Sequence, residues 1–490
     1  MMSPLLIPVA LLVLVFTFLL IRTLQLQHPP DNVQEIEKPT VDRAKISREL
    51  SSAIRIPTIS RAVMQPQDRK PFTEMHAWIT ESYPNISEQL ERTVINEYSL
   101  LYKWQGSESR LRPVLFNAHM DVVPVEEQTL KEWKVDPFEG AVREWYVWGR
   151  GALDMKSTLV GLLHSAEKLL AEGYQPKRTI YLAFGHDEEI MGFEGTVKIV
   201  DHLKKKNVKL AALLDEGGMV SLDAVEGVDE PVALVGNTEK GYLTLRVSAE
   251  GAPGHSSRPP RQTAIGIVAR ALAVIDDNPM PATVDYFLPT LRKVGYVLPF
   301  GLQFAVANAD IFGKTIVRRL EKKPETNGML RTTHAATVIS GGIKDNVLPA
   351  RAEAKVNMRL LPGDTIEKVI DHFKKAVNDP RVEFEIDRES GAWEASSVAP
   401  ISEPPFLTLE LVIRQMFGNV PTAPFVFMAA TDSRYYQPVC DHIFKFSPHR
   451  ISSEERNSVH GINERISQNE LVNMAAFFQR LMKVWGEAEF

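Results

Sequence analysis

The fold of this chain is decided by the stretch Pro113-Val-Leu-Phe-Asn-Ala-His119-Met-Asp121, a short apolar run that ends in two polar side chains. Residues two apart on an extended segment project to the same side, so His119 and Asp121 can share one site. Two later apolar runs, at 179–184 and 210–214, are also followed by carboxylates. These carboxylates are Glu188, Glu189 and Asp215. The pattern predicts buried parallel strands of an α/β sheet, which binds ligands at the carboxyl ends of its strands.

A fourth segment, Gly149-Arg-Gly-Ala-Leu-Asp154-Met-Lys-Ser, places an aspartate inside a glycine-rich turn. The residues that follow are apolar at helical spacing, so Asp154 is predicted to lie at a strand-to-helix junction. Two metal ions about 3.5–4 Å apart need a shared anion, and an aspartate that reaches out of a tight turn can bridge them. Imidazole and carboxylate ligands without a thiolate suit zinc, with manganese or cobalt as substitutes.

Each fragment also has an ordinary interpretation. His-x-Asp is commonly a turn pair, Glu188-Glu189 a solvated cap, Asp154 a helix N-cap and Asp215 a turn residue. Their joint occurrence, in order, at the ends of successive strand-like runs favours a two-metal hydrolase site. Because Glu188 and Glu189 are adjacent, they point to opposite sides of an extended chain. One of them is therefore expected to bind metal while the other transfers a proton.

Five motifs carry a resemblance to a known family. They are Ala118-His-Met-Asp-Val-Val-Pro, Gly149-Arg-Gly-Ala-Leu-Asp-Met-Lys, Gly185-His-Asp-Glu-Glu, Gly254-His-Ser-Ser and Val459-His-Gly-Ile-Asn-Glu. From about residue 45 to the C-terminus, the chain resembles the di-zinc metallopeptidase family of aminoacylase, carboxypeptidase S and glutamate carboxypeptidase. The resemblance implies two Zn²⁺ ions per chain.

The same resemblance implies the roles of individual residues. The implied metal ligands are His119, Asp154, Glu189, Asp215 and His460. Asp154 would contact both ions, Asp121 would orient His119, and Glu188 would be the general acid and base. Glu216 is the alternative to Asp215. We prefer Asp215 because it is the first polar residue after the apolar run.

Further stretches indicate a branch of the family whose secreted members make and cleave amides between long-chain fatty acids and amino acids. These stretches include Asn278-Pro-Met-Pro, Arg331-Thr-Thr and Thr431-Asp-Ser-Arg. The expected substrates are N-acyl amino acids, fatty acids and amino acids, with hydrolysis and condensation at one site. A carboxypeptidase S-like enzyme acting on short peptides is the alternative within the enzyme class. A descendant of the fold that only binds its ligands is the non-enzyme alternative.

Composition agrees with a globular enzyme of two domains. The formal charge of −6, with acidic and basic residues interspersed, argues against a nucleic-acid partner. Cys440 is the only cysteine, which excludes an intramolecular disulfide and a thiolate cluster. A homodimer is compatible with the sequence.

The N-terminal segment is apolar. Residues 1–21 carry no charged side chain, which is typical of a signal peptide or of a membrane anchor. We expect residues 1–27 to direct the chain into the secretory pathway, as a secreted or as a membrane-anchored lumenal protein. Asn85-Ile-Ser is a sequon, so a glycoprotein is expected.

The middle of the chain changes pattern. Alternating segments and two helical stretches predict the order β-α-β-β-α-β, a small α+β lid inserted into the catalytic domain. We expect the catalytic domain at 40–237 and 396–490 and the lid at 238–395. The family resemblance implies that the lid contributes three substrate contacts, His255, Asn346 and Arg359. Their ordinary interpretation is as turn and exposed strand residues.

A long segment, about 281–327, separates the first lid helix from the next lid strand. Its apolar part, 294–306, is predicted either to line a channel for a fatty chain or to pack against the lid, and we prefer packing.

Overall fold

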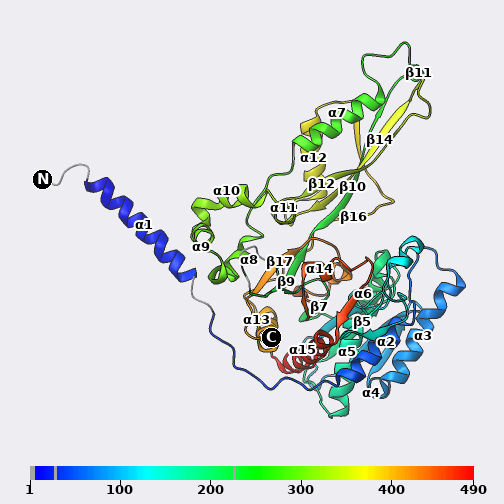
Figure 1. The fold of residues 1–490 in the computed structure, drawn as a ribbon, viewed down its shortest axis with the longest axis vertical. Helices are drawn as coiled ribbons and strands as arrows, with labels where there is room; N and C mark the ends of the chain where they lie inside the picture. Colours follow the sequence, from blue (N-terminus) through cyan, green and yellow to red (C-terminus); the bar gives the residue numbers. More distant parts are fainter. Residues whose placement is uncertain (1–5, 27–29, 224–227, 229) are drawn as a thin grey trace.

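A mixed ten-stranded β-sheet forms the core of the catalytic domain (Figure 1). The structure is a computed structural model and describes residues 6–26, 30–223, 228 and 230–490. The strands run in the order β1-β2-β6-β3-β7-β18-β9-β8-β19, with β17 beside β9, and β6, β3, β7 and β18 are mutually parallel. Their bounds are Glu91–Ile95 (β1), Ser99–Trp104 (β2), Val114–His119 (β3), Ile180–Gly185 (β6), Ala212–Asp215 (β7), Met219–Ser221 (β8), Val232–Glu239 (β9), Thr422–Phe427 (β17), Ile443–Lys445 (β18) and Arg450–Ile451 (β19).

Helices cover both faces of this sheet because its central strands are apolar on both sides. On β3, Phe116 joins the large core that includes α2, α5, α13 and α15, while Leu115 joins a smaller core with α6. The alternation of neighbouring side chains between two cores is what the continuous apolar run predicts. The helices are α2 (Arg43–Ile54), α3 (Pro66–Ser82), α4 (Pro84–Gln89), α5 (Lys156–Ala171), α6 (Thr196–Lys205), α13 (Pro404–Phe417), α14 (Ser453–Arg456) and α15 (Gln468–Glu487).

The lid is a separate antiparallel sheet with two helices on one face (Figure 1). Its strands are β10 (Gly241–Glu250), β12 (Thr333–Gly341), β14 (Arg351–Leu360), β15 (Val382–Ile386) and β16 (Ala392–Trp393), and its helices are α7 (Ala264–Asp277) and α12 (Ile366–Val377). The chain order of the six main elements is β-α-β-β-α-β. The predicted fold class, an α/β catalytic domain with an inserted α+β lid, is therefore confirmed.

The long segment inside the lid folds into helices rather than loop. They are α8 (Leu288–Lys293), η3 (Gly295–Val297), α9 (Phe300–Ala307), α10 (Ala309–Leu320) and α11 (Pro324–Leu330). Val294, Leu298 and Val306 are buried together with Ala423 of β17, so this segment packs on the edge of the catalytic sheet. The segment therefore packs, but against the catalytic sheet and not against the lid as predicted, and the channel interpretation stays a prediction.

The first half of the N-terminal helix α1 (Leu6–Leu26) projects away from the rest of the molecule, while its carboxyl-terminal half contacts α9 (Figure 1). Residues Pro8–Leu26 have a mean hydropathy of 2.3, and only 11% of the most apolar window is buried. A signal sequence and a membrane anchor share these properties, so this finding is consistent with either.

The sequon asparagine is engaged within the fold. The side-chain amide of Asn85 donates a hydrogen bond of 2.7 Å to the buried carboxylate of Glu167, which also accepts the backbone N–H groups of Asn85 and Ile86. A glycan on Asn85 has to be accommodated beside this network, and glycosylation stays a prediction.

Candidate metal centre

Three neighbouring strands bring the polar residues together. His119 ends β3, Glu188 and Glu189 begin the 3-10 turn η2 (Glu188–Ile190) after β6, and Asp215 ends β7. Because β6, β3 and β7 are adjacent and parallel, their carboxyl ends lie at one edge of the sheet. The sequence predicted that these polar side chains lie close together, because each of them follows an apolar run.

Asp154 lies between two histidines that are far apart in the sequence. Its Oδ1 is 3.0 Å from Nε2 of His119, and its Oδ2 is 3.0 Å from Nε2 of His460. The same nitrogen of His460 is 3.2 Å from Oε2 of Glu189. Atoms able to bind a metal on His119, Asp154 and Glu189 all lie within 4.8 Å of one another.

A second group shares His119 and contains Glu188 and Glu216. Oε1 of Glu216 is 3.5 Å from Nε2 of His119. Asp215 lies elsewhere, because its two oxygens accept hydrogen bonds of 3.0 Å from the Asn117 side-chain amide and from the Ser433 backbone N–H. The alternative, Glu216, is therefore the carboxylate that faces His119, and the choice of ligand between the two stays a prediction.

Asp121 is fully buried and holds several parts of the site in place. Its carboxylate accepts the backbone N–H groups of Glu188 and Glu189, each at 3.1 Å, and the Ser60 hydroxyl at 2.6 Å. Nδ1 of His119 is 2.9 Å from the backbone carbonyl of Asp121 and 3.4 Å from its carboxylate. Asp121 therefore orients His119 through its main chain and the adjacent glutamates through its side chain.

The loop that carries Asp154 is held by Glu464, a residue to which the sequence assigned no role. The buried Glu464 carboxylate accepts the backbone N–H groups of Leu153 and Asp154 at 2.7 and 3.1 Å, and an N–H of Arg150 at 2.7 Å. Arg150 also donates to the carbonyl oxygen of His460 at 3.2 Å. One buried ion pair thus connects the Asp154 turn to the His460 turn. The only sequence signal was the acidic end of the Val459-His-Gly-Ile-Asn-Glu motif.

Glycine is required at position 151 of the same loop. The backbone there has a φ of +87°, and a Cβ atom would lie 2.8 Å from Cγ1 of Val122. A residue other than glycine would be strained and would push on the segment that follows Asp121.

The site carries a surplus of negative charge. Burial raises the pKa of Glu188 well above its ordinary value, and repulsion from Glu216, Asp432 and Glu189 adds to this shift against the attraction of His119. Burial disfavours protonation of His119, but the carboxylates of Glu216, Asp121 and Asp154 outweigh it, so its pKa is raised well above the usual range. Hydrogen bonds to Asp154 and Glu189 raise the pKa of His460 to about 10. A cation would relieve the same repulsion.

The donor set fits divalent metal ions. It contains only imidazole and carboxylate groups, which suit zinc, and Oε1 of Glu189 is buried with no hydrogen-bond partner among the described residues. A buried carboxylate oxygen without a hydrogen-bond donor is a group that a cation would satisfy.

The predicted lid contacts lie apart from this centre. His255 is in β11 (Gly254–His255), which pairs with β13 (Val347–Leu348), and the Asn346 carbonyl accepts the N–H of Ser256 there. β11 is at the far end of the lid from the catalytic sheet (Figure 1). Arg359 is in β14, with its guanidinium carbon 4.9 Å from the centre of the Tyr242 ring. The structure does not bring His255, Asn346 or Arg359 to the metal centre, and their substrate contacts stay predictions.

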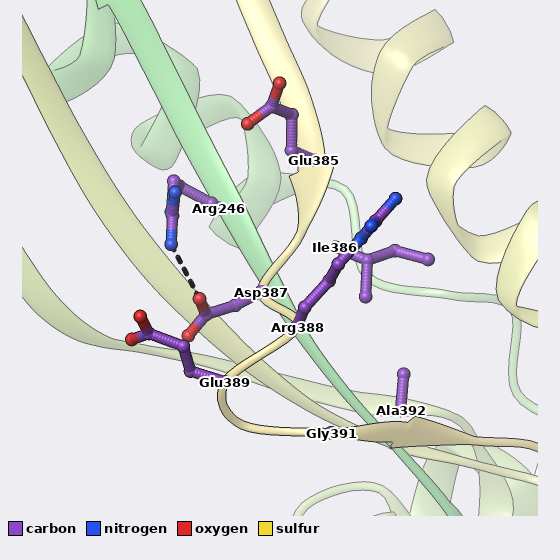
Figure 2. Close-up of a pocket in the computed structure, with 8 residues that line it drawn as sticks. All are labelled: Arg246, Glu385, Ile386, Asp387, Arg388, Glu389, Gly391 and Ala392. Carbon is purple, nitrogen blue, oxygen red and sulfur yellow. Dashed lines mark hydrogen bonds and ion pairs between the residues drawn. The ribbon is translucent and has the colours of Figure 1, made fainter.

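A hollow on the lid surface is also separate from the centre (Figure 2). It lies beside β10 and β15, where Asp387 binds Arg246 at 2.7 Å and Lys355 at 2.6 Å. None of the residues that line it belongs to the metal centre, so we assign it no part in the chemistry.

Comparison with known proteins places this arrangement in a family. Residues 115–484 match peptidase family M20/M25/M40. The chain belongs to this family. Its members are metallohydrolases, which agrees with the clustered histidine and carboxylate side chains.

Two relatives are similar to the chain over most of its length. The chain is 37% identical over 456 residues to the N-fatty-acyl-amino acid synthase/hydrolase of Xenopus tropicalis, an alignment that covers 90% of this chain and 86% of the relative. It is 33% identical over 458 residues to the probable carboxypeptidase S-like 2 of Dictyostelium discoideum, covering 93% and 87%.

Solved structures show the same M20 fold. A metallo-carboxypeptidase from Sulfolobus solfataricus superposes with a TM-score of 0.64 at 15% identity, covering 91% of this chain and all of that chain. Human carnosine dipeptidase 1 superposes with a TM-score of 0.62 at 14% identity, covering 91% and 96%.

Proposed function

We propose that this M20 enzyme hydrolyses, and in reverse forms, the amide bond between a long-chain fatty acid and an amino acid, with two Zn²⁺ ions. The observation that carries the metal assignment is the position of Asp154, whose two oxygens face two different histidines. A carboxylate in this position is suited to bridge two cations.

We assign the residues to two metal positions that would share Asp154. His119 and Glu216 would hold one ion, and Glu189 and His460 the other. When bound, the ions would polarise the scissile carbonyl and lower the pKa of water. Manganese or cobalt would be substitutes with the same ligands.

Glu188 is the proposed general acid and base. Glu188 lies beside His119 and Glu216, and its main-chain N–H donates to the Asp121 carboxylate. The main-chain N–H of the neighbouring Glu189 donates to the same carboxylate. Its raised pKa makes the ionised group a stronger base, which suits a residue that accepts a proton from the attacking water and returns it to the leaving nitrogen. Because a catalyst lowers both barriers, the same residue would serve condensation when fatty acid and amino acid are abundant.

The test of this division of labour compares two isosteric variants. We expect Glu188→Gln to lower kcat by at least about 10²-fold while zinc content stays near two equivalents, since an amide cannot shuttle the proton. We expect Glu189→Gln to lower zinc occupancy. A Glu188→Gln enzyme with the wild-type rate, or one that loses zinc as Glu189→Gln does, would show that the roles are wrong.

The substrate class rests on the relatives. Similarity to the N-fatty-acyl-amino acid synthase/hydrolase of Xenopus tropicalis favours fatty-acyl amides, and similarity to the carboxypeptidase S-like protein of Dictyostelium discoideum favours short peptides. We expect a long-chain acyl phenylalanine or leucine to be cleaved with a higher kcat/KM than its acetyl analogue or a Gly-Leu-type dipeptide. Preference for the dipeptide would move the assignment to a carboxypeptidase, and a metal-loaded protein without turnover would indicate a binding-only descendant.

We also propose a location in the secretory pathway, either secreted or anchored and lumenal. Apolar α1 supports entry into that pathway.

A further inference from the structure

The carboxyl-terminal half of α1 packs against α9 and the start of α10 (Figure 1). The rings of Phe16 and Phe304 are 6.3 Å apart, and Leu26 packs against the buried cluster that contains Val294 and Leu298. A Cβ atom on Gly295 would lie 2.5 Å from Cγ of Leu26. The surface under α1 is therefore shaped closely to this helix.

Polar groups are matched across the same contact. The Asn308 side-chain amide donates to the carbonyl of Leu19 at 3.2 Å, to the hydroxyl of Thr23 at 3.4 Å and to the carbonyl of Phe304 at 2.9 Å. Thr23 and Asn308 are fully buried. Because α1 supplies two of these three acceptors and covers Asn308, loss of α1 would leave the amide with the Phe304 carbonyl and expose it to water. A segment that is removed during maturation requires no such complementary site.

The uncharged stretches of α1 and of residues 294–309 end at the same point of their contact. No charged residue occurs from Val294 to Ala309 or before Arg22, and Arg22 pairs with Asp310 at 2.9 Å. After this pair, α10 exposes a basic face. Ile311, which is 56% exposed, is followed at helical spacing by the exposed Lys314 and Arg318.

The other half of α1 extends beyond its docking site. Val9 to Val15 expose large apolar side chains, and the helix points away from the body (Figure 1). A helix satisfies its own backbone hydrogen bonds, so this half of α1 can lie in the hydrocarbon of a bilayer. In water its apolar side chains would stay in contact with solvent. An apolar helix beside a basic amphipathic one is typical of chains that lie at an anionic bilayer surface.

We propose that α1 stays in the mature protein, that α9 and α10 are its docking site, and that the three helices seat the enzyme on an anionic lipid bilayer. Phe300, Phe304 and the rest of α9 would lie beside α1 in the apolar layer. Lys314 and Arg318 of α10 would lie among the headgroups. This proposal concerns the attachment of the chain and stands independently of its substrate.

The docking is tested by a disulfide in the full-length chain. Adding one C–C bond to the 2.5 Å separation places Cβ atoms at positions 26 and 295 at most about 4 Å apart, which is within disulfide range. We expect Leu26→Cys with Gly295→Cys to form that bond in membranes from the expressing cells. Leu26→Cys with Gly301→Cys is the matched control, because a Cβ atom on Gly301 meets nothing within 4 Å. A mature chain that begins after residue 26, or a retained α1 without the 26–295 bond, would overturn the proposal.

The lipid contact is tested separately in proteoliposomes of phosphatidylcholine and phosphatidylserine. A fluorophore on Ile311→Cys should be quenched by brominated lipid, while one on Val63→Cys, which is 73% exposed in the catalytic domain, should not. Cys440 is buried and does not compete for the label. The double change Lys314→Glu and Arg318→Glu should weaken quenching in vesicles that contain phosphatidylserine. Equal quenching at both labelled positions, or quenching that the charge reversal does not weaken, would overturn the assignment of α10 to the headgroups.

Discussion

Replacement of Glu464 by glutamine tests how the Asp154 loop is built. The carboxylate accepts four hydrogen bonds, from Arg150 at 2.7 Å and from the backbone N–H groups of Gly151, Leu153 and Asp154 at 3.0, 2.7 and 3.1 Å. Glutamine keeps one acceptor oxygen but turns an NH₂ group toward these donors. Arg150 then loses its counter-charge, and at least one buried N–H loses its acceptor.

The expected cost is large because the pair is buried. The Arg150 side chain is 4% exposed and that of Glu464 is 0% exposed, and removing one partner of a buried ion pair costs about 3–5 kcal/mol in unfolding free energy. The same loop positions Asp154 and His460, so zinc affinity should fall by about 10–100-fold.

Glu108→Gln is the matched control. Glu108 binds Arg110 at the same 2.7 Å, but the two side chains are 31% and 64% exposed. A surface pair of this kind contributes about 1 kcal/mol or less. The N–O distance is the same in the two pairs, so the difference between the variants reports burial together with the three backbone hydrogen bonds that Glu464 accepts.

Urea unfolding of chelator-treated protein measures the stability change without a metal contribution. Competition with a chromophoric chelator measures zinc affinity. If Glu464→Gln and Glu108→Gln lose equal stability, or if Glu464→Gln binds zinc as the wild type does, then the buried carboxylate does not hold the loop as we argue.

The remaining predictions concern the metals, the ligand choice and pH. Purified protein should contain close to two zinc equivalents and lose turnover when a chelator removes them; full activity in metal-free protein would contradict the two-metal assignment. Glu216→Gln should lower zinc occupancy more than Asp215→Asn, which should mainly lower the unfolding midpoint, because an amide can accept from only one of the two donors, Asn117 and Ser433; the reverse order would favour Asp215 as the ligand. Burial lowers the pKa of His449 from 6.5 to about 4, so the unfolded chain binds the extra proton between these values. Stability should therefore be unaffected by this group above pH 6.5 and fall by about 3 kcal/mol toward pH 4; His449→Gln, compared by urea midpoints in chelator, should flatten that slope, and parallel curves would refute the assignment.

Local pattern alone was enough for the architecture and for the meeting of several polar side chains at one edge of the sheet. The apolar runs before His119, Glu188 and Asp215 predicted buried parallel strands, and parallel neighbours necessarily bring their carboxyl ends together. Alternation in the middle of the chain predicted the lid topology in the same way. A strand buried on both faces is a continuous apolar run, and a strand buried on one face alternates between apolar and polar residues. Both patterns can be recognised in the sequence alone.

Three features required the tertiary structure. Asp215 and Glu216 are neighbours, and only the Ser433 N–H and the Asn117 amide, from distant segments, decide that Asp215 turns away and Glu216 faces His119. Glu464 contacts Asp154 across 310 positions of the chain, and Asn308 contacts Leu19 across 289. The sequence determined which side chains stand at the strand ends, because periodicity records local burial. Which of two adjacent carboxylates points inward, and which remote residue holds a loop, was decided by packing between segments that leave no shared period in the sequence.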